Sequence, residues 1–363
     1  MGSAAAWRLA RRGARVLGLD RYAPPHHRGS SHGHTRIIRE AYHEHPLYVP
    51  LVRRARTLWE ELAAESATTL LQRTGGLIVG PLDGELVLGA TLSARRYSLP
   101  HETWSAADIR ARVPVMRVPD DITGLFEPNA GVLFPERCID AMLHEAARHG
   151  AHLLRDTTVT GWTRAGDHIA VATAAHDYQA SRVILTAGPW LAGLLGSMVL
   201  PLSLERAVQF WFQPAASAAL FDASRFPVFL LEYARGRMFY GVPAFEHGIK
   251  VAFHHHGEPA TADGLPRRVG DEETRAVRRM LERWIPDAAG TLRDASVCIY
   301  TNTPDGHFVI DRHAQAPEVL VASCCSGHGF KFAPAVGELL ADLVAGVQPA
   351  FDILPFRAGR FAM

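Results

Sequence analysis

Lysine is almost absent from this chain. Among 363 residues it occurs only at Lys250 and Lys331, and every other basic side chain is arginine. A chain with this bias uses arginine wherever a generic positive charge suffices. The lysine ammonium is compact, approaches a ligand closely and shifts its pKa when buried. We therefore expect both lysines to occupy functional positions; the alternative is that two lysines survive by chance on the surface.

The chain also has almost no net charge, no long apolar run and no cysteine framework. The formal net charge of +1 gives no electrostatic basis for binding nucleic acid or an acidic membrane. No apolar run reaches the ~20 residues of a membrane-spanning helix, and no signal peptide is visible. Four cysteines in this length do not make a disulfide framework, and the adjacent Cys324 and Cys325 do not easily bridge each other. We expect a cytoplasmic protein with reduced thiols.

Two of the three glycines of a dinucleotide-binding turn are missing from the beginning of the chain. The residues MGSAAAWRLARRGARVLGLDRY predict a helix over 3–12, a stop at Gly13 and a short apolar strand that ends at Asp20. The dinucleotide-binding unit is a strand, a G-x-G-x-x-G turn, a helix, and a second strand with an acidic residue. Only Gly2 precedes the helix here. The helix N-terminus favours a pyrophosphate and Asp20 suits a ribose, although an ordinary helix–strand pair explains the same pattern.

Parallel α/β patterns occur at the beginning, middle and end of the chain, and β-rich patterns lie between them. Apolar periodicity predicts helices over 46–66, 84–98 and 270–285, and strands within 75–81, 124–135 and 182–190. The fold class is therefore α/β, or α+β overall, with a nucleotide-binding domain interleaved with an antiparallel-sheet substrate domain. The expected boundaries are 1–75, 135–205 and 290–363 for the first domain, and 76–134 and 206–289 for the second.

Two glycine-rich stretches suggest where a ligand lies. Arg36 and Arg39, within GSSHGHTRIIREAY, lie on one side if that stretch is helical, and arginine pairs with carboxylates through two hydrogen bonds. Gly327 and Gly329 allow the backbone to approach a ligand, and Lys331 follows them. A solvated basic face is the alternative for the arginines. Ligands are expected between the two domains, at the carboxyl ends of the parallel strands.

Histidines and cysteines in two β-rich stretches are harder to interpret. In a strand over 248–256, Lys250 and His254 share one face, so both are placed to line a cavity. The three histidines at 254–256 do not predict a metal site, because consecutive strand residues point to opposite faces. Cys298, beside Tyr300 in an apolar run, reads from its pattern alone as a small core residue.

These stretches together resemble the family of monomeric sarcosine oxidase and N-methyltryptophan oxidase, flavoprotein amine oxidases of the glycine oxidase/D-amino acid oxidase fold group. The resemblance covers nearly the whole chain and is carried, in family order, by GSSHGHTRIIREAY, FEPNAGVLFPERCI, FYGVP, IKVAFHHHG, SVCIYTNTPDGHFVID and SGHGFKF. It implies FAD attached covalently through Cys298, as an 8α-S-cysteinyl link. This implication replaces the core interpretation of Cys298.

The resemblance also implies a role for each remaining candidate residue. Arg39 and Lys331 match the positions that hold the substrate carboxylate, and Lys250 matches the lysine that accelerates the reaction with oxygen. His254, Tyr300 and Tyr240 match residues on the substrate side of the flavin. The cofactor is expected to contact Gly2, Asp20, His32, Thr35, Arg36, Val159, Gly188, Gly327, Gly329 and Lys331.

The implied activity is oxidation of a secondary or N-methyl amino acid to an imine, with O₂ reduced to hydrogen peroxide, by a monomer that binds no metal, nucleic acid or membrane. Sarcosine, N-methyltryptophan, pipecolate and a cyclic imino acid all remain open as substrates. Leu230 or Leu231 stands where sarcosine oxidases tend to have methionine, which puts sarcosine itself in question. The alternatives are a flavin dehydrogenase with another electron acceptor and an inactive remnant.

The family also explains the missing glycines. Its members begin with an apolar strand and the full glycine turn, and this chain matches from the last glycine, Gly2, onward. The sequence therefore predicts an N-terminally truncated protein, through a mis-set start or a shortened gene. It also predicts a gap, or a rearrangement, where the first strand of the parallel sheet would lie.

Overall fold

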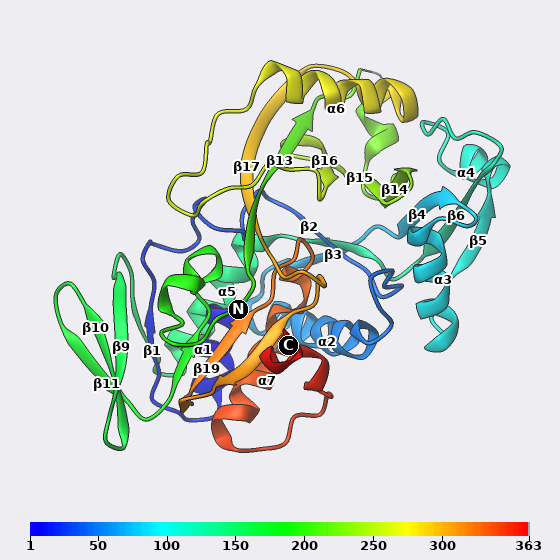
Figure 1. Ribbon diagram of the computed structural model, residues 1–363. Helices are drawn as coiled ribbons and strands as arrows, with labels where there is room; N and C mark the ends of the chain where they lie inside the picture. The colour runs from blue at the N-terminus through cyan, green and yellow to red at the C-terminus, as the bar shows by residue number, and fades with distance from the viewer. Residues whose placement is uncertain (216, 362–363) are drawn as a thin grey trace.

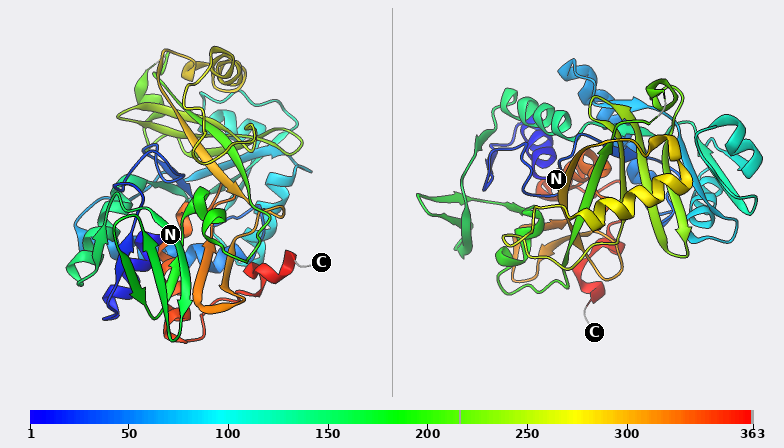
Figure 2. Two further views of the ribbon diagram at one scale, coloured as in Figure 1. Left: turned by 60° about the vertical axis from the view of Figure 1, so that its left-hand side comes forward. Right: turned by 90° about the horizontal axis from the view of Figure 1, so that it is seen from above.

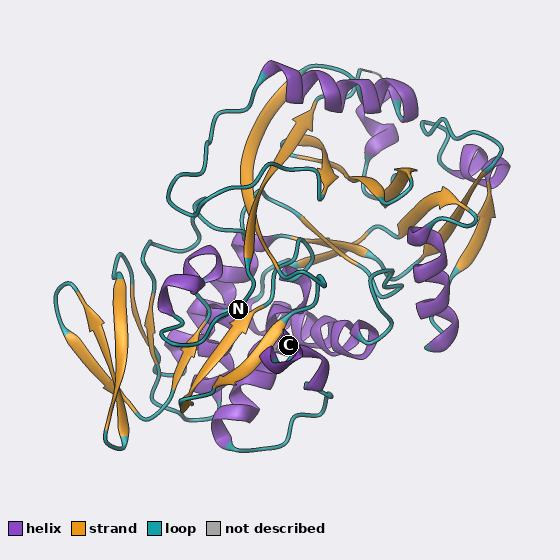
Figure 3. Cartoon of the chain, viewed as in Figure 1, coloured by secondary structure: helices purple, strands orange, loops and turns teal. Residues whose placement is uncertain are grey.

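The computed structural model describes residues 1–215 and 217–361. It has a strand-rich half and a helix-rich half, and Figure 3 shows most of the helices gathered on one side of the molecule. None of the helices within the described residues is both long enough and apolar enough to cross a membrane. The two halves meet along the cavity that is described below.

A sheet of eight strands forms the first half, in the order β17-β13-β16-β15-β14-β4-β6-β5 (Figure 1). All neighbours are antiparallel except β14 and β4, which run parallel. The strands are β4 (Gly76–Pro81), β5 (Glu102–Ser105), β6 (Ile122–Glu127), β13 (Ser203–Phe212), β14 (Val228–Ala234), β15 (Arg237–Phe245), β16 (Gly248–His254) and β17 (Leu292–Asn302). Helices α3 (Glu85–Arg96) and α4 (Ala106–Arg112) pack at its β4–β6 end.

Side-chain alternation gives this sheet one apolar face and one functional face. Helix α6 (Asp271–Trp284) contributes Val277 and Leu281 to the apolar core that contains Phe210 and Val251. The residues between these on the strands point the other way. Lys250 is therefore directed to the cavity, opposite the side covered by α6.

Helices α1 (Gly2–Arg11), α2 (Tyr48–Ser66), α5 (Pro135–Arg148) and α7 (Ala333–Ala345) build the second half. Helix α1 packs against α5 and α7, with Ala4, Trp7 and Ala10 buried. A Cβ on Gly337 would lie 2.6 Å from the carbonyl carbon of Ala4, so glycine permits the close approach of α7 to α1.

The parallel strands of this half lie in two separate small sheets. Strand β1 (Leu17–Leu19) pairs with β8 (His152–Leu154), and β12 (Val183–Leu185) pairs with β19 (Ala316–Ser323), which also carries the antiparallel β18 (Val309–His313). Among the described residues no strand joins β1 to β12, and the residues of both line the cavity. The parallel strands of this half therefore form two sheets on either side of the cavity lining rather than one continuous sheet.

Two further three-stranded sheets complete the chain. One contains β2 (Arg36–Ile38), β7 (Gly131–Leu133) and β3 (Leu71–Arg73). The other contains β9 (Val159–Ala165), β10 (His168–Thr173) and β11 (Asp177–Ala180), and it projects from the side of the molecule (Figures 1 and 2). Short 3₁₀ helices lie at Gly188–Leu194, Ala218–Phe221, Pro286–Ala288, Phe330–Phe332, Leu354–Phe356 and Ala358–Phe361.

The structure confirms the expected α/β class and the interleaving of the two kinds of segment, and it corrects two details. The stretch around Arg36 is a strand, not a helix, because β2 pairs with β7. Residues Leu292–Asn302, placed by sequence within the nucleotide-binding segment 290–363, form β17 of the large sheet, because their apolar alternation pairs along β13.

Candidate active site

A cavity of about 1360 Å³ runs from the N-terminus of α1 to the functional face of the large sheet. Sites for drug-sized ligands occupy ~300–1,000 Å³, so this cavity suits a larger ligand, such as a dinucleotide together with a small substrate. Most of the predicted site residues line it: Gly2, Asp20, Thr35, Arg36, Arg39, Val159, Gly188, Tyr240, Lys250, His254, Tyr300, Gly327, Gly329 and Lys331. Cys298 and His32 are buried beside it.

The end of the cavity at α1 has the features of a nucleotide site. Gly2 begins the helix at the cavity wall, where the free N–H groups and the helix dipole favour a phosphate. Asp20 follows β1, and its Oδ1 accepts a hydrogen bond of 2.9 Å from the amide of Tyr22, leaving the rest of the carboxylate available for a ribose. Val159 and Gly188 lie on the same wall of the cavity.

Several buried polar atoms in and beside the cavity wall have no hydrogen-bond partner among the described residues. Thr35 Oγ1, Gln209 Oε1 and Thr301 Oγ1 belong to residues that line the cavity, and His32 Nε2 is buried beside it. Buried polar groups are normally paired, so four orphans in one region indicate a polar ligand that supplies the missing partners. Burial, with nearby cations second, lowers the pKa of His32 to about 3, so its ring is neutral and keeps an acceptor. These residues fit the polar edge of a flavin.

Lys250 is fully enclosed in this region. Only 2% of the residue is exposed, and its Nζ donates to the carbonyl oxygens of Gly33 at 2.9 Å and Thr35 at 2.8 Å. An ammonium has three N–H groups, so one remains for a ligand in the cavity. Burial, followed by the charge of Arg36, lowers the pKa of Lys250 well below its ordinary value.

The thiol of Cys298 lies one layer behind the cavity wall. It is 1% exposed, and its Sγ lies 3.6 Å from the carbonyl oxygen of Ser30 and 3.8 Å from Nη2 of Arg36, both of which line the cavity. Cys298 packs in a small cluster with Ala207, Tyr300 and Cys325.

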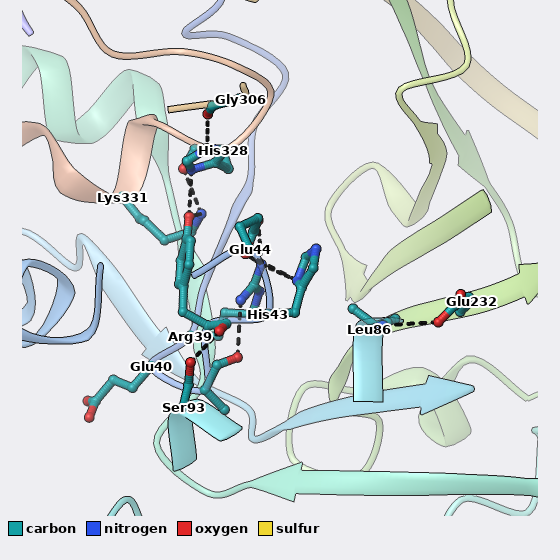
Figure 4. A network of polar contacts seen from close by, with 12 residues as sticks. Arg39, Glu40, His43, Glu44, Leu86, Ser93, Glu232, Gly306, His328 and Lys331 are labelled. Atoms are coloured by element: carbon teal, nitrogen blue, oxygen red, sulfur yellow. Dashed lines mark hydrogen bonds and ion pairs between the residues drawn. The ribbon is translucent and has the colours of Figure 1, made fainter. Parts of the chain in front are cut away.

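Arg39 already holds a carboxylate. Its Nη2 lies 2.7 Å from both oxygens of Glu44 and 2.8 Å from Nδ1 of His43, and Nη1 donates to Ala41 O at 3.1 Å (Figure 4). Burial alone would raise the pKa of Glu44, but the nearby positive charges, that of Arg39 foremost, together outweigh it and hold that pKa well below its ordinary value. The arrangement is a carboxylate-binding site on the cavity wall, filled from within the chain.

Lys331 adds a second cation at this end of the cavity. Its Nζ donates to His328 O at 2.7 Å and to the hydroxyl of Tyr42 at 3.3 Å. Burial, followed by repulsion from Arg39, lowers the pKa of Lys331 to about 7. A carboxylate placed between Lys331 and Arg39 would favour the charged form of the lysine.

Aromatic and imidazole groups form the wall opposite the two cations. His254 Nδ1 lies 3.4 Å from the hydroxyl of Tyr300, and Tyr240 pairs with Ala252 on the same face of the sheet. Burial lowers the pKa of His254 well below its ordinary value and raises that of Tyr240 to about 12, so all three groups are neutral near pH 7. Gly327 adopts φ +73°, and a Cβ there would lie 2.6 Å from His254.

Sequence reasoning missed several contributors to this site. Glu44 and Gln209 lie outside the motifs quoted above, whereas Tyr42 ends GSSHGHTRIIREAY and His328 lies within SGHGFKF. Tyr42 and His328 act through partners distant in the chain, whereas Glu44 binds Arg39, five residues before it. Leu230, noted as a departure from the sarcosine oxidases, lines the cavity, whereas Leu231 is fully buried on the other face.

Within the described residues there is no group of three or more histidine, cysteine, aspartate or glutamate side chains able to hold a metal ion. The ring centroids of His254 and His255 lie 4.2 Å apart, so these consecutive residues do not point to opposite faces. His255 Nδ1 lies 3.1 Å from Glu205 Oε2, and His256 Nδ1 lies 2.9 Å from Nη1 of Arg237.

Comparison with known proteins identifies the family of this chain. The DAO family profile, described as FAD dependent oxidoreductase, matches residues 1–343. The chain is 41% identical to a monomeric sarcosine oxidase of Streptomyces avermitilis, covering 100% of this chain and 95% of the relative. It is 36% identical to an N-methyl-L-tryptophan oxidase of Citrobacter koseri, covering 99% and 96%.

The fold has close counterparts among solved structures. The open form of NikD, an unusual amino acid oxidase essential for nikkomycin biosynthesis, superposes with a TM-score of 0.86 at 22% identity, covering 98% of this chain and 94% of NikD. The cavity, the family profile and the relatives all indicate an FAD-dependent oxidoreductase. The chain belongs to the DAO family of FAD-dependent oxidoreductases, and within it to the group that contains monomeric sarcosine oxidase and N-methyl-L-tryptophan oxidase.

Proposed function

We propose that this protein is an FAD-dependent oxidase of a secondary or N-methyl amino acid, with O₂ as electron acceptor. One observation carries the proposal: inside a cofactor-sized cavity, a buried arginine holds a carboxylate through contacts of 2.7 Å beside a buried lysine. A substrate carboxylate has the same chemistry as the Glu44 side chain. Relatives named sarcosine oxidase and N-methyl-L-tryptophan oxidase support an N-methyl amino acid.

The first task of the site is to orient the substrate. In the proposal, the substrate carboxylate displaces Glu44 from Arg39 and takes the free N–H of Lys331. Two cationic anchors on one carboxylate restrict its rotation, and this fixes the direction of the Cα and the amine nitrogen. The neutral side chains of His254, Tyr240 and Tyr300 line the remaining wall.

The second task is to favour the neutral amine, whose lone pair assists loss of hydride from the adjacent carbon. Arg39, Lys331 and Lys250 surround the cavity, and their positive field lowers the pKa of a substrate ammonium. His254 has an imidazole held neutral by burial, so it is available as a hydrogen-bond partner of that amine.

The bound FAD supplies the redox chemistry, accepting a hydride from the carbon next to nitrogen and later passing two electrons to O₂. Lys250 places its free N–H beside the orphaned polar atoms of Thr35 and Gln209, where it stabilises negative charge that develops on oxygen. We further propose that the sulfur of Cys298 would form a thioether to the 8α carbon of the flavin, with the thiol proton and one hydrogen of that carbon lost and the two electrons passed through the flavin to O₂. The proximity of its Sγ to the cavity-lining Ser30 and Arg36 supports this link.

Apolar side chains line the substrate side of the cavity beyond the two cations. Leu230, Met238 and Val242 line it together with Tyr240. The proposed substrates are therefore sarcosine, N-methyltryptophan, pipecolate and cyclic imino acids, with apolar side chains placed against Leu230. We propose that the enzyme acts as a cytoplasmic monomer on a free small molecule.

The test is to purify the protein, record its visible spectrum, and measure hydrogen peroxide over a panel of N-alkyl and cyclic amino acids, with the matching primary amino acids as controls. We expect a flavin spectrum and stoichiometric peroxide with at least one secondary amine. Bleaching of the flavin by substrate without peroxide in air would indicate a dehydrogenase instead. A flavin-containing protein that no member of the panel reduces would contradict the proposal.

A further inference from the structure

A chain of hydrogen bonds extends from Lys331 away from the cavity. Lys331 Nζ donates to the hydroxyl of Tyr42 at 3.3 Å, and this hydroxyl lies 2.7 Å from Nδ1 of His328. The other ring nitrogen, Nε2 of His328, lies 3.0 Å from the carbonyl oxygen of Gly306 (Figure 4). Tyr42 is fully buried and does not line the cavity, so it does not contact the substrate.

The carbonyl oxygen of Gly306, at one end of this hydrogen-bond chain, determines the donor and the acceptor of every hydrogen bond in it. A carbonyl oxygen only accepts, so Nε2 of His328 carries the proton. Nδ1 of the neutral ring is then an acceptor, and the Tyr42 hydroxyl must donate to it. The lone pairs of Tyr42 are left facing Lys331, which donates to them. Burial lowers the pKa of His328 to about 4 and raises that of Tyr42 well above its ordinary value, so neither group charges near pH 7.

The direction of these hydrogen bonds determines which N–H of Lys331 is free. One of its three N–H groups goes to Tyr42 and a second to the carbonyl of His328 at 2.7 Å. The third points away from both acceptors, toward the cavity that Lys331 lines. If His328 had the opposite tautomer, Tyr42 would donate toward the ammonium and repel it.

We propose that Tyr42 and His328 are positioning residues that orient Lys331 for the substrate carboxylate, with the carbonyl of Gly306 setting the polarity of the chain. This inference rests on the proposed function, because it requires Lys331 to bind that carboxylate. Neither residue exchanges a proton in the reaction. Their effect is to keep a flexible side chain in one orientation, and so to reduce the rotamer entropy that binding would otherwise cost.

The protein offers a substitution that removes one hydroxyl from this hydrogen-bond chain, and a matched control. Tyr42→Phe removes only the hydroxyl and keeps the ring, over which the Arg39 guanidinium lies at 4.3 Å. Tyr48 also packs its ring near His328 and Phe332, but its hydroxyl lies 3.1 Å from His307. Tyr48→Phe therefore removes a neighbouring hydroxyl without changing the hydrogen bonds that lead to Lys331.

The measurement is the dissociation constant of acetate, followed by its perturbation of the visible spectrum of the bound flavin. We expect Tyr42→Phe to weaken acetate binding by up to about tenfold, because binding must then immobilise the freed Lys331 side chain, and Tyr48→Phe to leave it unchanged within twofold. With the amino acid substrate, KM should rise more than kcat falls. His328→Leu should reproduce the loss, and His328→Asn should restore much of it, because its amide oxygen supplies an acceptor near the Nδ1 position.

Repeating the acetate measurement in the Lys331→Met protein separates this inference from the proposed function. In Lys331→Met the acetate site itself should weaken, and adding Tyr42→Phe should cost nothing more. If Lys331→Met does not change acetate binding, the carboxylate role of Lys331 fails and the inference fails with it. If Lys331→Met weakens binding but Tyr42→Phe does not, or if Tyr42→Phe has the same effect in both backgrounds, only the inference is overturned. If the Tyr42→Phe protein does not fold, the comparison of His328→Leu with His328→Asn distinguishes the same outcomes.

Discussion

Replacing Lys250 by methionine isolates the reaction with oxygen. Methionine keeps most of the length and apolar surface of the lysine and removes its charge and its three N–H groups. In the structure those groups hold the carbonyls of Gly33 and Thr35 at 2.9 and 2.8 Å, and the remaining one faces the polar centre of the cavity. The substitution therefore removes the nearest buried cation from the place where oxygen is expected to gain charge.

The size of the effect follows from electrostatics. A unit charge ~4 Å from a developing negative charge is worth ~4 kcal/mol at an effective dielectric constant of 20, and loss of one preorganised donor costs ~10²–10³-fold in rate. We expect reoxidation of the reduced enzyme by O₂ to slow by about 10²–10³-fold. Reduction by substrate should slow by less than about tenfold, because Arg39 and Lys331 still hold the carboxylate.

Stopped-flow absorbance measures the two half-reactions separately, the first under anaerobic conditions and the second after mixing the reduced enzyme with oxygenated buffer. Lys331→Met is the matched control, because it removes the only other lysine and should weaken substrate binding while leaving reoxidation near the wild-type rate. Flavin content and Tm of each variant are recorded to exclude loss of structure. Equal slowing of both half-reactions, or unchanged reoxidation in Lys250→Met, would refute the oxygen role.

Three other predictions concern the tether, the carboxylate site and the substrate wall. Cys298→Ala should abolish covalent flavin, so that acid-precipitated protein is colourless and its intact mass has no flavin adduct; a retained adduct would show another attachment site. Because the pKa of Lys331 is about 7, the dissociation constant of acetate should rise by up to tenfold per pH unit above that value, until the contribution of the lysine is lost; Lys331→Met should flatten this profile over the same range. Leu230→Ala should shift kcat/KM toward bulkier N-alkyl substrates at little cost in stability, whereas Leu231→Ala, on the buried face, should lower the free energy of unfolding by ~2–5 kcal/mol without changing that preference.

Local sequence pattern determined much of the arrangement of the site. Alternation along a strand predicted that Lys250 and His254 share a face, and the structure places both on the cavity wall. The scarcity of lysine pointed to Lys250 and Lys331, and both are buried against the same cavity. The first inference holds because side-chain direction in a strand depends on nearby residues only, and the second because the composition leaves lysine at only two positions.

The tertiary structure alone decided how the cations are used. The hydrogen bond between Tyr42 and Lys331 joins residues 289 positions apart, and that between Lys250 and Gly33 joins residues 217 apart. The capture of Arg39 by Glu44 depends on a turn after β2, in a stretch where helical spacing was considered. No short-range pattern encodes the two long-range contacts, because they form only when helix packing and sheet pairing bring distant segments to one cavity, where burial makes each unpaired polar group costly.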